Sequence, residues 1–225
     1  MKGILVSFYF PVLSIKHVES YQVASSYPML MPSTIIGGIA YSLHMLNICN
    51  GNQCLEEARN LISKAREIPH EIPIQSNFIL KRSRVLEGEA KWDAMVRQGI
   101  LHNESKILLL PRKNDIDLIR RALYLVARLG DSESLVTVKD IKEVDFYECD
   151  VKKINVPIRI SQGIMSKLGG NYMIYPMTDE NGNRAMFALP LSSIQDRYAP
   201  SDITFNGATL CSSDNRIFIP QGEEW

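Results

Sequence analysis

The chain has 225 residues, of which 45% are hydrophobic and 22% are charged; this composition excludes a mainly disordered protein and is sufficient for one large domain or two small ones. Its 25 basic and 25 acidic residues give no net charge. The field of the whole molecule therefore does not attract nucleic acid, and a local basic patch, or a partner in a larger assembly, has to supply any such binding.

The N-terminal stretch MKGILVSFYFP contains an apolar run from Gly3 to Phe10 that ends at Pro11. A continuous apolar run of this length is typical of a strand buried on both faces. The run is too short to span a membrane and lacks the small-residue cleavage site of a signal peptide. We therefore expect a cytoplasmic protein without membrane contact.

The four cysteines form no CxxC pair and have no histidine at zinc spacing: Cys49, Cys54, Cys149 and Cys211. Because disulfides are rare in the cytoplasm, we expect all four to be reduced thiols. We expect no metal ion and no cofactor.

Residues 12–32 lack a clean period and contain two prolines, Pro28 and Pro32, which predicts an extended loop on the surface. We expect its polar side chains to be accessible: Lys16, His17, Glu19 and Tyr21. A helix is predicted to follow, with Ser33 as its N-cap and a buried stripe at Ile36, Ile39, Leu43 and Leu46.

Two glycines, Gly37 and Gly38, lie in the first two turns of this predicted helix. Each costs about 1 kcal/mol there relative to alanine, which predicts that something near the helix start needs a bare backbone. One explanation is access, because a helix N-terminus attracts anions and a missing side chain lets a phosphate approach. The other is close packing of the helix on the sheet. The sequence leaves both open.

A second amphipathic helix is predicted over residues 53–69, with Leu55, Ala58, Ile62 and Ala65 on one face. The stretches IPIQSNFILKR (72–82) and ESKILLLPR (104–112) are typical of strands. The long polar insert between them predicts that these two strands form a hairpin that projects from the body.

The stretch NDIDLIRRALYLVARLGD predicts a helix capped by Asn114 or Asp115 and ended by Gly130, and SLVTVKDIKEVDFYE predicts a strand after it. The resulting order βαββαβ, with one extra helix, predicts an α+β fold with a ferredoxin-like (RRM-like) domain over residues 1–150. Residues 151–225 show no helical period, and TDENGN is a hairpin signal. We expect a small β-rich domain there.

The motifs of the common enzyme classes are absent. The sequence contains no GxxxxGK[ST] phosphate loop, no HExxH, no zinc-deaminase signature and no GxSxG elbow. It also lacks the aromatic strand pattern of ferredoxin-like sheets that bind RNA in the usual way.

Positive charge is concentrated around the predicted hairpin. The basic residues there are Lys81, Arg82, Arg84, Lys91, Arg97 and Lys106, and Trp92 lies among them. Phosphate contacts combined with stacking of a base on an aromatic ring are a natural use of such a segment. The alternative is a solvated β-ribbon whose Trp92 docks on the protein's own core.

The stretch YPMLMPSTIIGGIAYSL resembles the N-terminal signature of the CRISPR-associated Cas-five family (RAMP superfamily), and ARLGDSESLVTV resembles its later glycine segment. The chain length and the stretch WDAMVRQGI most resemble archaeal type I-A members. The resemblance implies a ferredoxin-like N-terminal domain, a projecting thumb hairpin at about residues 82–106 and a smaller β-rich C-terminal region.

The resemblance further implies a non-catalytic RNA-binding subunit of a type I effector complex (Cascade) in antiviral defence. Such a subunit holds the 5′ handle of the guide RNA, caps the Cas-seven backbone and contacts the large subunit. RNA contacts are then expected at Lys16, His17, Tyr21, Ser33, Thr34, Gly37, Lys81, Arg82, Arg84, Lys91, Trp92 and Arg97.

Two alternatives remain. One branch of the family, type I-C, cleaves precursor RNA without metal by means of a tyrosine, a lysine and a histidine. Lys16, His17 and Tyr21 would supply the base and the proton donor for such cleavage, although their spacing does not match that branch. The other alternative is an RNA-independent protein-interaction module, because the ferredoxin-like fold hosts many functions.

Overall fold

The structure is a computed structural model that describes residues 1–17, 25–86, 89–112, 115–195, 197–222 and 225. Its helices are α1 (Pro32–Met45), α2 (Gln53–Leu61), α3 (Ile116–Tyr124) and α4 (Gln162–Met165). The strands of the first two thirds of the chain are β1 (Lys2–Tyr9), β2 (Val12–Leu13), β3 (Ile62–Ile68), β4 (Ile74–Leu86), β5 (Glu89–Leu101), β6 (Glu104–Pro111) and β7 (Thr137–Cys149). The strands after residue 150 are β8 (Lys153–Ile154), β9 (Ile158–Arg159), β10 (Leu168–Gly169), β11 (Met173–Thr178), β12 (Arg184–Leu189), β13 (Leu191–Ile194), β14 (Arg197–Pro200), β15 (Ile203–Phe205), β16 (Thr209–Ser212) and β17 (Phe218–Pro220).

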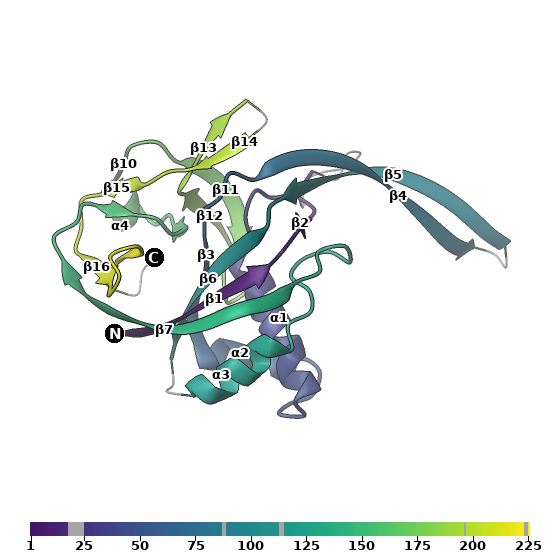
Figure 1. Ribbon diagram of the computed structural model, residues 1–225, viewed down its shortest axis with the longest axis horizontal. Coiled ribbons are helices and arrows are strands. Elements are labelled where there is room, and N and C mark those ends of the chain that lie inside the picture. The colour runs from purple at the N-terminus through teal and green to yellow at the C-terminus, as the bar shows by residue number, and fades with distance from the viewer. Residues whose placement is uncertain (18–24, 87–88, 113–114, 196, 223–224) are drawn as a thin grey trace.

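The central sheet has the strand order β17-β16-β7-β1-β6-β3, and each neighbouring pair is antiparallel. Among β1, β3, β6 and β7, the fourth strand in the chain lies beside the first, followed by the third and then the second. Figure 1 shows α1, α2 and α3 on the same side of this sheet. The described chain is therefore a strand-rich, mixed α/β fold.

Side chains of β1 alternate between the two faces of the sheet. Ile4, Val6 and Phe8 belong to the core that α1 and α3 cover. Leu5 packs against a second core, on the opposite face, to which the C-terminal strands contribute. The prediction of an N-terminal strand with apolar side chains on both faces is confirmed.

α1 begins at Pro32, with Met31 at the N-cap position and no side-chain cap. Proline suits the first helical turn because its missing N–H would have no partner there. The prediction that Ser33 caps the helix is therefore wrong, since Ser33 lies within the first turn. The predicted stripe is confirmed at Ile36, Ile39 and Leu43, which are buried.

The second predicted helix is wrong in its second half. α2 ends at Leu61, and Ile62–Ile68 forms β3, which pairs with β6. The buried Arg66 contacts Glu180, and the buried Glu67 accepts a hydrogen bond from Ser105 Oγ at 2.6 Å. These partners are distant in the sequence, and they stabilise a strand where the local spacing fits a helix. The third helix also ends early, because α3 stops at Tyr124.

β4 and β5 form the projecting hairpin, and they pair from Ile74 with Leu101 to Leu86 with Glu89. The predicted pairing partner, ESKILLLPR, is instead β6 of the central sheet. That prediction is wrong because the polar insert itself forms the return strand. Figure 1 shows the hairpin extending away from the body on the side opposite the two chain termini. Its base joins β2 and β14 in a five-stranded sheet.

The C-terminal third is rich in strands, as predicted, and β11 pairs with β12 across the turn TDENGN. Two small sheets of three strands lie in this region. β16 and β17 extend the central sheet beyond β7, so the two parts of the chain share one sheet. The domain boundary at residue 150 stays a prediction.

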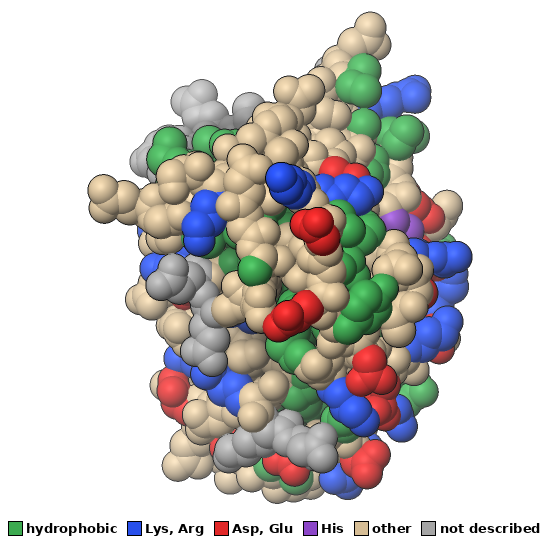
Figure 2. Space-filling view, turned by 90° about the vertical axis from the view of Figure 1, so that its left-hand side faces the viewer, with side chains coloured by type: hydrophobic (Ala, Val, Ile, Leu, Met, Phe, Trp, Pro, Cys, Tyr) green, Lys and Arg blue, Asp and Glu red, His purple; other side chains and the backbone are tan. Residues whose placement is uncertain are grey.

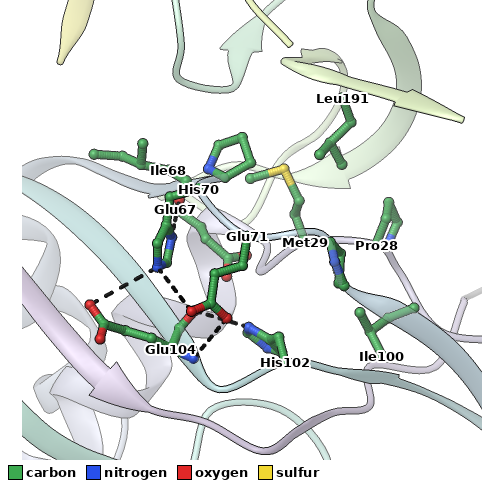
Figure 3. Close-up of a pocket in the computed structure, with 12 residues that line it drawn as sticks. Pro28, Met29, Glu67, Ile68, His70, Glu71, Ile100, His102, Glu104 and Leu191 are labelled. Carbon is green, nitrogen blue, oxygen red and sulfur yellow. Dashed lines mark hydrogen bonds and ion pairs between the residues drawn. The ribbon is translucent and has the colours of Figure 1, made fainter. Parts of the chain in front are cut away.

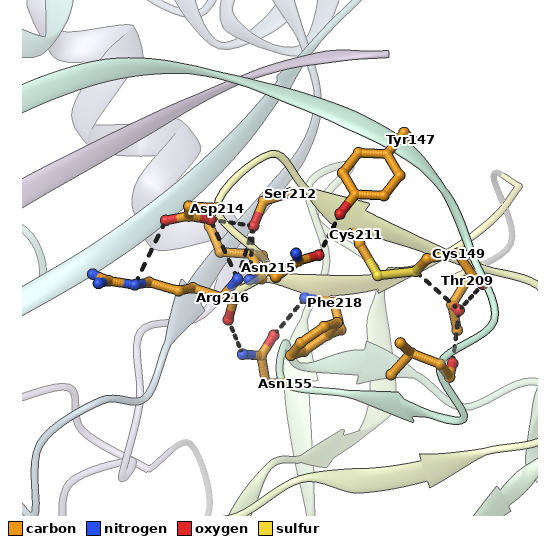
Figure 4. The surroundings of a disulfide bond; sticks show 12 residues. Tyr147, Cys149, Asn155, Thr209, Cys211, Ser212, Asp214, Asn215, Arg216 and Phe218 are labelled. Atoms are coloured by element: carbon orange, nitrogen blue, oxygen red, sulfur yellow. Dashed lines mark hydrogen bonds and ion pairs between the residues drawn. A yellow bond between two sulfur atoms is a disulfide. The ribbon is translucent and has the colours of Figure 1, made fainter.

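Two disulfides join the four cysteines, Cys49 with Cys54 and Cys149 with Cys211. The expectation of reduced thiols is therefore wrong. Cys149 ends β7 and Cys211 lies in β16, and the antiparallel pairing of these strands brings the two sulfurs together (Figure 4). The two residues are 62 positions apart, so the sequence spacing gives no sign of their proximity.

Candidate nucleic-acid interface

One face of the β4–β5 hairpin exposes large side chains to solvent. Ile79 lies opposite Val96 across the two strands, and these residues are 71% and 49% exposed. On the same face Trp92 is 65% exposed, and Lys81 Nζ lies 4.7 Å from the centre of its ring. This exposure excludes the alternative in which Trp92 docks on the protein's own core.

Three further basic residues belong to the outer half of the hairpin. Arg82 lies opposite Asp93, and Arg84 lies opposite Lys91; the side chains of these two arginines and of Lys91 are outside the part of the chain that the structure describes. At 3.3 Å per residue, Trp92 is about 30 Å along β5 from Leu101 at the hairpin base. An arm of this length reaches a ligand well away from the body.

Arg97, which we predicted as an RNA contact, is occupied by acidic partners at the base of the hairpin. It forms ion pairs with Asp131 and Glu133, the second with Arg97 Nη1 2.8 Å from Glu133 Oε1. The Arg97 side chain is mostly buried by this contact. Its guanidinium therefore fixes the hairpin to the loop after α3, and its role as an RNA contact stays a prediction.

The same loop is bonded to the segment after β2. Asp131 donates its N–H to Ser14 O at 2.9 Å and accepts a hydrogen bond from Lys16 N through its carboxylate at 3.2 Å. Gly130 has a φ of +120°, and a Cβ there would lie 2.9 Å from Ser14 O, so only glycine permits this approach. The hairpin base, residues 14–16 and residues 130–134 thus form one connected unit.

Of the three residues considered for RNA cleavage, the structure describes two. The Lys16 residue is exposed. The His17 ring stacks on Tyr27, with centroids 3.9 Å apart and an interplanar angle of 11°, and lies 5.7 Å from the ring of Tyr175. Tyr21 lies outside the described residues. The stacking on Tyr27 fixes the orientation of the His17 ring.

A groove of about 380 Å³ runs between the first half of α1 and the segment 127–135. Thr34 and Gly37 line it from the helix, together with the exposed Tyr41, while Arg128 and Leu135 line it from the loop. The glycine floor, the phenol ring and the guanidinium together suit a nucleotide. Three of these groove residues, Tyr41, Arg128 and Leu135, are not among the site residues predicted from the sequence. One of them could have been found from the sequence, because Tyr41 lies off the buried stripe of α1 and is therefore expected on the surface.

The two glycines of α1 have different surroundings. A Cβ at Gly38 would lie 2.7 Å from Cδ2 of the buried Leu129, whereas nothing lies within 4 Å of a Cβ at Gly37. Gly38 therefore permits close packing of α1 on the segment after α3. Gly37 faces the groove, where a bare backbone leaves room for a ligand.

The fold brings together two histidines that are far apart in the sequence, His70 and His102, in a small cavity at the hairpin base (Figure 3). His70 Nε2 lies 4.0 Å from the carboxylates of Glu71 and Glu104, and burial, followed by the nearby Lys106, lowers the pKa of His70. The cavity measures about 30 Å³, which is enough for one or two water molecules and too small for a nucleotide. A nucleotide therefore does not fit beside these histidines.

Within the described ranges there is no group of three or more His, Cys, Asp or Glu side chains that would hold a metal ion. The helices that the structure describes include none with the length and apolar character needed to cross a membrane.

Comparison of the sequence with known proteins identifies the family of the chain. No protein-family model matches the chain. A curated CRISPR-associated protein Cas5 from Thermoproteus tenax is 33% identical to it over 228 residues, which cover 96% of this chain and 96% of the relative. The chain belongs to the Cas5 family.

Solved structures agree with the fold of this Cas5-family chain. A CRISPR protein from Archaeoglobus fulgidus aligns with a TM-score of 0.60 and 11% identity over 99% of this chain and 100% of that chain. A chain of the type III-B Cmr-beta complex bound to cognate target RNA and AMPPnP aligns with a TM-score of 0.52 and 13% identity over 90% of this chain and 86% of that chain. At these identities the similarity concerns the fold alone.

In this Cas5-family chain, the predicted site residues that the structure describes fall into three places. Lys81 and Trp92 lie together on the hairpin, whereas Lys16, His17 and Arg97 lie near its base. Ser33, Thr34 and Gly37 belong to the first turns of α1. The loop of residues 130–134 connects two of these places, because Asp131 and Glu133 pair with Arg97 at the hairpin base and Gly130 lines the helix groove.

Proposed function

We propose that this Cas5-family protein is a non-catalytic, guide-RNA-binding subunit of a type I CRISPR effector complex (Cascade). It holds the 5′ handle of the guide RNA and caps the Cas-seven backbone beside the large subunit, in the cytoplasm. The observation that carries the proposal is the exposed pair of Trp92 and Lys81 on a projecting hairpin that also contains Arg82, Arg84 and Lys91. Aromatic stacking and phosphate contacts are the two interactions by which proteins bind single-stranded RNA.

We also infer that β1, β3, β6 and β7 with α1 and α3 form a ferredoxin-like unit. Two features support this inference: the chain order βαββαβ, and antiparallel pairing that places the fourth strand beside the first. In this arrangement the hairpin is an insertion between β3 and β6, the second and third strands of the unit.

The proposal of a non-catalytic role rests on the surroundings of three histidines: His17, His70 and His102. The His17 ring is stacked on Tyr27, and the cavity of His70 and His102 is too small for RNA. Metal-free cleavage needs a base and a proton donor that both reach the scissile nucleotide.

The two disulfides bear on the proposed cytoplasmic location, because cytosolic disulfides are rare outside the intracellular proteins of hyperthermophiles.

The proposal is tested with the purified full chain and an RNA that carries the repeat-derived 5′ end. Removing a charge-assisted hydrogen bond costs about 1.5–3 kcal/mol, so Arg82→Ala combined with Arg84→Ala should weaken binding at least about tenfold. Arg121→Gln removes an exposed cation of α3 and should leave the affinity unchanged. Equal affinity of all three proteins would refute the RNA-binding role.

Incubation of the same protein with precursor repeat RNA in EDTA distinguishes the cleaving alternative. We expect intact RNA. Cleavage that disappears in the variant His17→Ala would establish the endoribonuclease instead.

A further inference from the structure

A pocket of about 510 Å³ lies at the end of the central sheet that is remote from the hairpin. Lys64 of β3, Arg112 after β6 and Arg159 of β9 line it, together with Asp179 and Glu180. Pro111 at the end of β6 also lines the pocket, whereas Glu104 at the other end of that strand lies at the hairpin base. The pocket and the hairpin base are thus separated by about 20 Å, the length of β6.

The two carboxylates of the pocket already have partners. Glu180 accepts hydrogen bonds from the buried Arg66 and from Ala65 N. Asp179 Oδ1 accepts hydrogen bonds from the backbone N–H groups of Asn181 and Asn183, and its other oxygen lies 3.8 Å from Arg159 Nη1. Asp179 therefore stabilises the turn between β11 and β12, and Glu180 forms the ion pair with Arg66.

Two cations of the pocket form no ion pair with a described carboxylate. Among the described residues, no carboxylate lies within ion-pair distance of Lys64 or Arg112; Arg112 Nε donates to Arg59 O at 3.1 Å, and Lys64 Nζ lies 5.7 Å from the Trp225 ring centre. Burial, and next the neighbouring Arg66, lower the pKa of Lys64, against a smaller raising effect of the Glu180 carboxylate. Such a lysine, half-buried among guanidinium groups, is stabilised when an anion enters.

We propose that this pocket binds a phosphate-bearing ligand through Lys64, Arg112 and Arg159. Guanidinium groups bind phosphate oxygens in pairs, and lysine adds a point charge. The volume of the pocket is within the range of small-ligand sites. Figure 2 shows this end of the molecule, where the described basic side chains are interspersed with acidic and hydrophobic ones and form no continuous track among themselves. That distribution suits a compact phosphate group better than a long polyanion.

Calorimetric titration of the full chain with pyrophosphate, at an ionic strength held constant with sodium chloride, tests the proposal. We expect saturable binding that Lys64→Gln and Arg159→Gln each weaken about tenfold or more, the factor for removal of one charge-assisted hydrogen bond. Arg121→Gln in α3 is the matched control and should leave the affinity unchanged. Absence of binding, or equal binding by all variants, would overturn the proposal.

Competition identifies the source of the phosphate. If a single-stranded RNA octamer displaces pyrophosphate, the site accepts a backbone phosphate; if it does not, the ligand is a small phosphate compound.

Pyrophosphate binding by the pocket should not depend on the proposed binding of guide RNA by the hairpin. The double variant Arg82→Ala with Arg84→Ala should bind pyrophosphate as the wild type does, because the hairpin and the pocket lie at opposite ends of β6.

Discussion

The central sheet and the projecting hairpin are both built from long antiparallel strands, but they differ in where their apolar side chains go. In the sheet, Val6 and Ile107 are fully buried, whereas in the hairpin Ile79 and Trp92 are 71% and 65% exposed. Burial of apolar area drives folding, so the sheet residues hold the fold and the outer hairpin residues contribute little to it. Apolar side chains that folding leaves exposed on an arm are available for a partner.

The largest effect on the sheet side of this comparison is expected at Arg66. Its side chain is 1% exposed and contacts Glu180, Pro157 O and Trp225 O, which join β3 to the C-terminal strands. Arg66→Met leaves the buried Glu180 carboxylate uncompensated, and we expect a decrease of about 3–5 kcal/mol in the free energy of unfolding. Denaturant titration measures it, and a decrease below about 1 kcal/mol would show that this pair does not join the two parts.

The two disulfides should stabilise the fold by different amounts, because they close loops of different length. Cys149 and Cys211 are 62 residues apart and Cys49 and Cys54 are 5 apart; the chain-entropy model gives about 4 and about 2 kcal/mol of stabilisation, respectively. Cys149→Ser with Cys211→Ser should therefore lower the stability about twice as much as Cys49→Ser with Cys54→Ser. Thermal unfolding measures both losses of stability, and equal losses for the two double variants would contradict the larger role of the Cys149–Cys211 disulfide.

The two neighbouring glycines of α1 should respond differently to substitution by alanine. Gly38→Ala places a methyl group against Leu129, and we expect a net destabilisation of about 1 kcal/mol after the gain in helix propensity. Gly37→Ala meets no atom within 4 Å and should stabilise the fold by up to about 1 kcal/mol. If the groove holds RNA, Gly37→Ala should also weaken RNA binding. Thermal unfolding measures both stabilities, and a Gly38→Ala variant as stable as Gly37→Ala would contradict the close packing on Leu129.

His70 should make a small, pH-dependent contribution. Because burial lowers its pKa below the unfolded value of 6.5, the unfolded chain binds the proton more readily, and the stability falls as the pH decreases from 7 toward 5. His70→Asn removes this titration, so its stability should depend less on pH over that range. A parallel pH profile for wild type and variant would show that His70 does not contribute.

Much of the fold could be predicted from local patterns, and the errors arose where distant residues decide. The buried stripe of α1 and the turn between β11 and β12 follow from spacing within a few residues. The strand β3 was missed because its helix-like spacing is overridden by the partners of Arg66 and Glu67. The pairing of β4 with β5 is a different case, because it is local and starts from Leu86 opposite Glu89. The polar composition of the insert hides the return strand of this hairpin.

The candidate site also has some features that the local sequence predicts and others that depend on distant residues. The sequence predicts a basic hairpin that contains Trp92 and leaves open whether this ring is exposed; the structure shows it exposed beside Lys81. The partners of Arg97, in contrast, lie more than 30 residues away in the loop after α3. No local sequence pattern predicts these contacts. The groove residues Tyr41 and Leu135 come together only when α1 packs on that loop.

The salt dependence of RNA binding tests most directly the claim that the hairpin binds and the sheet supports it. For single-stranded RNA, the slope of log K against log salt decreases by about 0.7 for each phosphate that the protein no longer neutralises. The account predicts that Arg82→Ala with Arg84→Ala lowers the slope by about 1.4, twice that value, and leaves the thermal unfolding midpoint unchanged. An unchanged slope and affinity in a folded variant would contradict it.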